Sequence, residues 1–116
     1  MVAYGDRITI KSRREVDHMR EAARHVAEIL LELRERVEPG ISTAELDRLA
    51  EEAIEARGVE SSFKGYGPRG LPEYPAVLCV SVNDEIVHGI PGDRVLEDGD
   101  IVGIDFGITS SGFHGD

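Results

Sequence analysis

A change of hydrophobic period part-way along the chain constrains the fold more than any other feature. In the first half, apolar residues recur every three or four positions, which is the period of an amphipathic helix. The first such stripe follows Ser12 and Glu15, which form a capping box, and it ends before Pro39-Gly40. The residues predicted to face inward from this helix are Val16, Met19, Ala23, Val26, Leu30, Leu33 and Val37.

A second helix is predicted directly after the first. It begins at Ser42 or Thr43, with Glu45 placed to complete another capping box. Its expected end is Arg57, a cation in the last turn, followed by Gly58, which can adopt a left-handed conformation. The residues expected to face inward are Leu46, Leu49, Ala50, Ala53 and Ile54.

The second half has the patterns of strands and loops. Residues 59–63 suggest a short strand or its approach, and residues 65–75 hold six glycines and prolines in eleven positions, which predicts a loop. An apolar strand is expected over 76–82, a turn over 97–100, and an alternating, half-buried strand over 101–108. Two helices followed by strands predict an α+β fold in which the helices pack on an antiparallel β-sheet.

The length, charge and cysteine content of the chain limit its domain number, its partners and its compartment. With 116 residues, the chain is expected to form one domain, 1–116. Its formal net charge of −10 argues against nucleic acid or an anionic membrane as partners. A single cysteine, Cys79, excludes an internal disulfide and favours a reducing compartment. Met1–Lys11 lacks the apolar run of a signal peptide and no segment could span a membrane, so we expect a cytoplasmic protein.

Two aspartates near the end of the sequence are candidates for an interacting pair. A two-residue loop centred between Ser110 and Ser111 would place Asp105 directly opposite Asp116, where like charges need a shared proton or a cation. A three-residue loop would shift the register and leave a solvated tip whose acids never meet. Spacing alone favours this second interpretation.

His88 is the other candidate. Taken alone it is typical of an ordinary loop histidine, but it follows an apolar strand and precedes Gly-Ile-Pro, where Pro91 would fix the backbone. That position makes it a candidate catalytic residue.

Four motifs in the right order resemble type I methionine aminopeptidases. They are Phe63-Lys64-Gly65-Tyr66, the run Ser81-Val82-Asn83-Asp84-Glu85-Ile86-Val87-His88-Gly89-Ile90-Pro91, Asp98-Gly99-Asp100-Ile101-Val102 with Asp105, and Gly112-Phe113-His114-Gly115-Asp116. The match runs from the helix at Ser12 to the last residue and resembles the N-terminal half of such an enzyme. It implies half of a pita-bread fold and the metal-dependent removal of N-terminal methionine from nascent polypeptides.

The resemblance also implies roles for individual residues. Asp105 and Asp116 match metal ligands of a site for two divalent ions (Co, Mn, Fe or Zn), and His88 matches a catalytic histidine that contacts the substrate. The positions that match the methionine pocket are Phe63, Tyr66, Tyr74 and Cys79. The segment between Tyr66 and Tyr74 is longer than is usual in the family.

The second half of the family pattern, with its further metal-binding histidine and glutamates, is not in this sequence. Two carboxylates alone rarely hold a transition metal, so we expect the isolated chain to be inactive or weakly active and to bind metal poorly or not at all on its own. It would pair with a missing C-terminal half or with a second copy as a homodimer. The alternatives are a non-catalytic half-domain that binds peptide or self-associates, and a proline-directed peptidase of the same superfamily.

Overall fold

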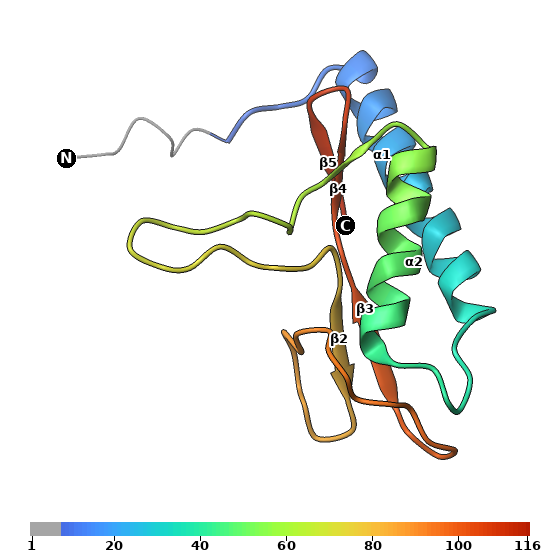
Figure 1. Ribbon diagram of the computed structural model, residues 1–116. Helices are drawn as coiled ribbons and strands as arrows, with labels where there is room; N and C mark the ends of the chain where they lie inside the picture. Colours follow the sequence, from blue (N-terminus) through green and yellow to red (C-terminus); the bar gives the residue numbers. More distant parts are fainter. Residues whose placement is uncertain (1–7) are drawn as a thin grey trace.

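The computed structural model describes residues 8–116, so the stretch screened for a signal peptide lies mostly outside the described residues. Two helices lie side by side along one side of the strands (Figure 1). This confirms the predicted α+β class. The elements are α1 (Arg13–Arg34), α2 (Thr43–Ala56), β1 (Glu60–Ser61), β2 (Cys79–Val82), β3 (Val102–Asp105), β4 (Ile108–Ser110) and β5 (Phe113–Gly115). No helix within residues 8–116 is both long and apolar enough to cross a membrane.

Helix α1 begins with the predicted capping box. The Ser12 hydroxyl accepts from the Glu15 N–H, and the Glu15 carboxylate accepts from the Ser12 N–H. The inward face differs from the prediction, because Met19 and Ala23 are exposed. Strand β5 lies directly against the backbone of α1 at Ala22, so the buried face of the helix is turned toward this strand. The buried residues of α1 are Ala22, Val26, Ile29 and Leu33.

Helix α2 shows only half of its predicted capping box. The Ser42 hydroxyl accepts from the Glu45 N–H, but the Glu45 carboxylate binds Arg48 instead of returning to the cap. At the other end, Arg57 is the C-cap and Gly58 has φ +66°, as predicted.

The predicted sheet is divided into two antiparallel sheets, with strand orders β1-β4-β5 and β2-β3. The single strand predicted over 101–108 was wrong, because it breaks at Phe106 and Gly107 into β3 and β4, which pair with different strands. The strand predicted over 76–82 forms only from Cys79 onward. Before it, the Val77 and Leu78 N–H groups both donate to Asp47 Oδ1 of α2, each at 2.9 Å.

The β4–β5 hairpin has a two-residue loop, as in the first alternative, but it turns one residue later. Its register pairs Ile108 with Gly115, so the loop is Ser111-Gly112, and both residues have positive φ, as a type I′ turn requires. Both interpretations of the spacing were therefore wrong in register: Asp105 and Asp116 are not directly opposed, and the loop has two residues instead of three. In the strand ladder Asp105 faces Cys79 instead.

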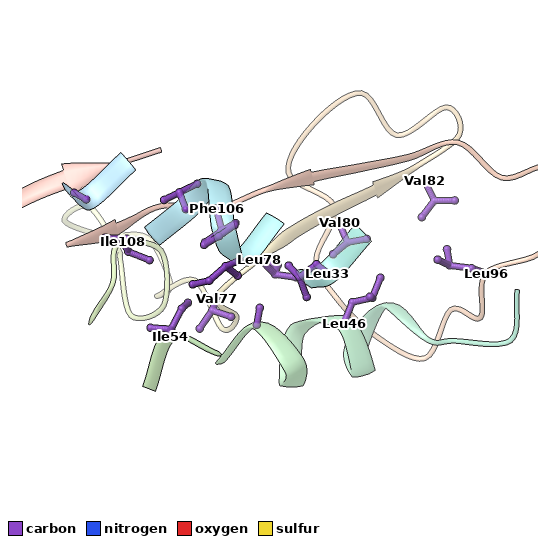
Figure 2. Packing of buried hydrophobic residues seen from close by; sticks show 14 residues of the cluster. Leu33, Leu46, Ile54, Val77, Leu78, Val80, Val82, Leu96, Phe106 and Ile108 are labelled. Atoms are coloured by element: carbon purple, nitrogen blue, oxygen red, sulfur yellow. The ribbon is translucent and has the colours of Figure 1, made fainter. Parts of the chain in front are cut away.

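One apolar cluster joins the helices to both sheets. Figure 2 shows side chains of α1, α2 and the strands meeting in it. Phe106, at the break between β3 and β4, is 1% exposed, so burial of its ring fixes the bend of the chain between the two sheets. The labelled members are Leu33, Leu46, Ile54, Val77, Leu78, Val80, Val82, Leu96, Phe106 and Ile108.

Candidate active site

A cavity of about 560 Å³ opens on the side of the strands. The segment after β1, the loop over 65–75, the start of β2, the loop after β2 and the end of β3 all contribute to it. Every residue predicted for the site except Asp116 lines it, and Ser62 and Ile90 were missed. The full lining is Ser62, Phe63, Tyr66, Tyr74, Cys79, His88, Ile90 and Asp105.

The wall of the cavity is built from rings at the base of the long loop. The Gly65 N–H donates to the Tyr74 carbonyl and the Tyr74 N–H to the Tyr66 carbonyl, which closes the base of the loop (Figure 1). The ring of Tyr74 meets Phe63 edge to face, with centroids 6.3 Å apart. Its hydroxyl donates to the Leu78 carbonyl at 2.8 Å. Although the loop is long, the ring of Tyr74 therefore still lines the cavity.

Cys79 is a buried thiol in this wall. Burial raises its pKa, the hydrogen bond with Tyr74 lowers it, and the charge of Asp105 raises it. Burial is also the main cause that raises the pKa of Tyr74. Both groups are therefore neutral at pH 7 and give the cavity an uncharged wall suited to an apolar or thioether side chain.

His88 reaches the cavity from a strained backbone position. Its φ is +60°, which is uncommon for a residue other than glycine. The next residue, Gly89, is buried: its carbonyl accepts from the Val80 N–H at 2.8 Å, and its N–H donates to the Ser81 hydroxyl at 3.0 Å. The sequence pointed to Pro91 as the residue that fixes this backbone, whereas the hydrogen bonds lie at Gly89.

Asp105 and Asp116 interact although they are not ladder partners. Continuing the β4–β5 register by one residue places Asp116 beside Gly107, and so diagonal to Asp105 on the same face. Partial burial raises the pKa of Asp105, and so do the charge of Asp116 and a side-chain hydrogen bond with it, while His88 lowers it. The acids therefore meet, by a different geometry from the one that spacing suggested.

A polar cluster beside the acids was not anticipated from the sequence. His114 Nδ1 lies 2.8 Å from the Ser62 hydroxyl and 3.1 Å from the Thr109 hydroxyl. His114 shares a strand face with Asp116, two residues on. Strand alternation could have pointed to His114, but Ser62 comes from the segment after β1, more than forty residues away in the sequence.

The donor atoms fit part of a metal centre. Carboxylate oxygens of Asp105 and Asp116 suit hard divalent cations, and their mutual repulsion favours a cation between them. Across residues 8–116, no group of three or more His, Cys, Asp or Glu side chains is arranged to hold a metal ion. The chain thus offers two candidate ligands, fewer than the three or more that a transition-metal site usually needs.

Comparison with known proteins identifies the family to which the chain belongs. The model of metallopeptidase family M24 matches residues 17–116, a range that contains every lining residue and both acids. The chain belongs to metallopeptidase family M24. Members of this family depend on divalent metal ions, in keeping with the paired acids.

Within the M24 family, methionine aminopeptidases resemble this chain over most of its length. The chain is 54% identical to methionine aminopeptidase 1 of Bacillus subtilis over 110 residues, covering 94% of this chain and 42% of the relative. The crystal structure of methionine aminopeptidase from Thermotoga maritima matches with a TM-score of 0.85 and 37% identity, covering 93% of this chain and 42% of that one. The chain thus has the architecture of part of a pita-bread fold.

Proline-directed peptidases are less similar to the chain in both fold and sequence. Xaa-Pro dipeptidase from Bacillus anthracis matches with a TM-score of 0.64 and 19% identity, covering 86% of this chain and 27% of that one. At that identity the likeness concerns the fold alone. The chain spans about 42% of the length of the methionine aminopeptidases that it matches.

Proposed function

We propose that the chain, acting as one domain over residues 1–116, supplies the methionine-binding part of a methionine aminopeptidase. The observation that carries this proposal is the cavity, which combines an uncharged wall with His88 and Asp105 at one site. The N-terminal methionine side chain would pack among Phe63, Tyr66 and Tyr74, with the Cys79 thiol at the base. Activity on new polypeptides would take place in the cytoplasm, a reducing compartment that the lone cysteine also favours.

Asp105 and Asp116 would hold part of a site for two divalent ions, of which Co, Mn, Fe and Zn are candidates. Such ions lower the pKa of water and polarise the scissile carbonyl. His88 would donate a hydrogen bond to the substrate next to the bond that breaks. Its strained backbone supports this role, because strain of this kind persists where function requires it.

A second candidate is a peptide-binding module without turnover. It is favoured by the absence of a three-residue ligand group within residues 8–116. In that case the cavity would still bind an N-terminal methionine, but release would not follow. A homodimer would give either function a second pair of acids.

Methionine release decides between these candidates. The chain would be incubated with a Met-Ala peptide and Co²⁺, Mn²⁺, Fe²⁺ or Zn²⁺, alone and mixed with a polypeptide that supplies the remaining part of the Bacillus subtilis relative. We expect release in the mixture and little from the chain alone. Asp105→Ala and Asp116→Ala should abolish release, whereas Asp98→Ala, an exposed acid of the turn before β3, should not.

Two other results would redirect the proposal. Stable peptide binding with no release in any mixture would establish the binding module. Equal release by the wild type and by Asp105→Ala would refute the metal role. Light scattering on the same samples would distinguish a mixed complex from a homodimer.

A further inference from the structure

The loop after β2 is hydrogen-bonded to β2 at Gly89, the residue next to His88. Gly89 makes two hydrogen bonds to β2, one through its carbonyl to Val80 and one through its N–H to Ser81. A Cβ at Gly89 would lie 2.1 Å from the Val80 carbonyl oxygen and 2.9 Å from Ser81 Cα. The loop therefore lies against the backbone of β2, at a distance that only glycine permits.

Ser81 occupies the cavity face of β2. Strand alternation places it on the same side as Cys79, which lines the cavity, while Val80 and Val82 point into the apolar core. Ser81 is only 8% exposed, and within residues 8–116 its hydroxyl has one recorded protein partner, the Gly89 N–H. A buried polar side chain on this face is therefore used to hold the loop.

The two hydrogen bonds restrain different peptide units of the loop. With the carbonyl bond alone, the peptide unit that precedes Gly89 could still rotate about Gly89. The second bond fixes the plane of that peptide unit, which joins His88 to Gly89. Since φ of His88 is +60°, a value that an unconstrained histidine leaves readily, the direction of its side chain depends on this restraint.

We propose that Ser81 is a positioning residue, whose hydroxyl holds Gly89 and thereby keeps the His88 side chain turned into the cavity beside Asp105. The importance of this role rests on the proposed function of His88. The hydrogen bond and the backbone conformation can be tested apart from that function. Ser81 does not line the cavity, so it would not touch a substrate bound there.

The first test measures the backbone by NMR, in the chain of residues 1–116. In the wild type, the Gly89 amide should exchange slowly with solvent, and His88 should show the strong intraresidue Hα–HN contact of a positive φ. Ser81→Ala should speed exchange of the Gly89 amide by about tenfold or more and weaken the His88 contact. Ser81→Thr, which keeps the hydroxyl, should restore both.

Thr43→Ala is the matched control. The Thr43 hydroxyl is also buried and accepts from a glycine N–H, that of Gly92, at 2.9 Å. Its loss should loosen Gly92 but leave the Gly89 amide and the His88 contact unchanged. A purely structural role for Ser81 predicts instead that both alanine variants act alike, with amides of β2 and β3 loosened to the same extent.

The second test uses the mixture that releases methionine. Ser81→Ala should lower kcat for a Met-Ala peptide about tenfold or more while KM changes little, because the rings that bind methionine are untouched. A wild type that releases no methionine would refute the proposed function but leave the NMR result to decide the role of Ser81. Rapid exchange of Gly89 in the wild type would overturn the positioning role, even if Ser81→Ala failed to fold.

Discussion

Replacing Gly115 with alanine tests how closely α1 and β5 are packed. A Cβ at this position would lie 2.5 Å from the carbonyl carbon of Ala22 and 2.6 Å from its oxygen. Carbon atoms in contact prefer about 3.5–4.0 Å, so the strand or the helix would have to move by about 1 Å. Both atoms of Ala22 belong to the backbone, so no side-chain rotation relieves the clash. Overpacking typically costs about 1–3 kcal/mol, and we expect Gly115→Ala at or above the upper end.

Urea unfolding followed by circular dichroism measures this loss. The control is Gly92→Ala, because no atom lies within 4 Å of its added Cβ and its φ is not left-handed. That variant should be stabilised by about 0.4–1 kcal/mol or left unchanged. If Gly115→Ala unfolds at the same urea concentration as the control, the close packing of β5 on Ala22 is refuted.

The same substitution should reach the candidate site, because Asp116 follows Gly115 directly. A shift of β5 would carry the Asp116 carboxylate away from Asp105. The pKa of Asp105 should then fall toward its usual value, since the neighbouring negative charge contributes to raising it. A carboxyl-carbon NMR titration measures this change, and an unaltered Asp105 pKa would show that the strand had not moved.

Three further predictions concern charged groups. Burial is the main cause that raises the pKa of Asp47, so its ionisation costs stability as the pH rises from about 3.9, the value in an unfolded chain, through the folded value. Asp47→Asn should therefore gain stability relative to the wild type over that range, whereas Asp47→Ala, which leaves two buried N–H groups without their acceptor, should lose about 2 kcal/mol or more in urea unfolding. Arg57→Met breaks ion pairs to two glutamates of α1, and its small loss of thermal stability should disappear in about 1 M salt. Asp116→Asn should lower the pKa of Asp105 in the same NMR titration, and a rise or no change would contradict their interaction.

The helices could be predicted because their signals are local. The capping box at Ser12 and the left-handed Gly58 each depend on residues within one turn. The exact inward face of α1 could not be predicted in this way. Ala22 is buried because β5, more than ninety residues on, lies directly against it, and no periodicity within the helix carries that information.

The hairpin register could have been predicted from the sequence. A two-residue type I′ turn requires positive φ at both central positions, which favours Ser111-Gly112 over Ser110-Ser111 because glycine is then at the second position. The break at Phe106 was harder to anticipate. The alternation through it is unbroken, and only the pairing with two separate sheets divides the strand.

The candidate site depended on two kinds of signal. Spacing alone favoured acids that never meet, whereas the family resemblance placed Asp105 and Asp116 in one site. Sequence reasoning missed Ser62 and Thr109, which both contact His114: Thr109 from the neighbouring strand of the same hairpin, and Ser62 from the segment after β1, which is distant in the chain. The Ser81–Gly89 hydrogen bond was missed for a similar reason, since it joins a strand to a loop that folds back on it.

The joint action of Asp105 and Asp116 in binding metal is the central claim, and calorimetric titration with Mn²⁺ tests it most directly. The chain would be titrated alone and together with the polypeptide that completes the Bacillus subtilis relative. We predict weak binding by the chain alone and tight binding by the mixture. Both Asp105→Asn and Asp116→Asn should abolish the tight binding, while Asp98→Asn should not. Tight binding that survives either of the first two substitutions would contradict the claim.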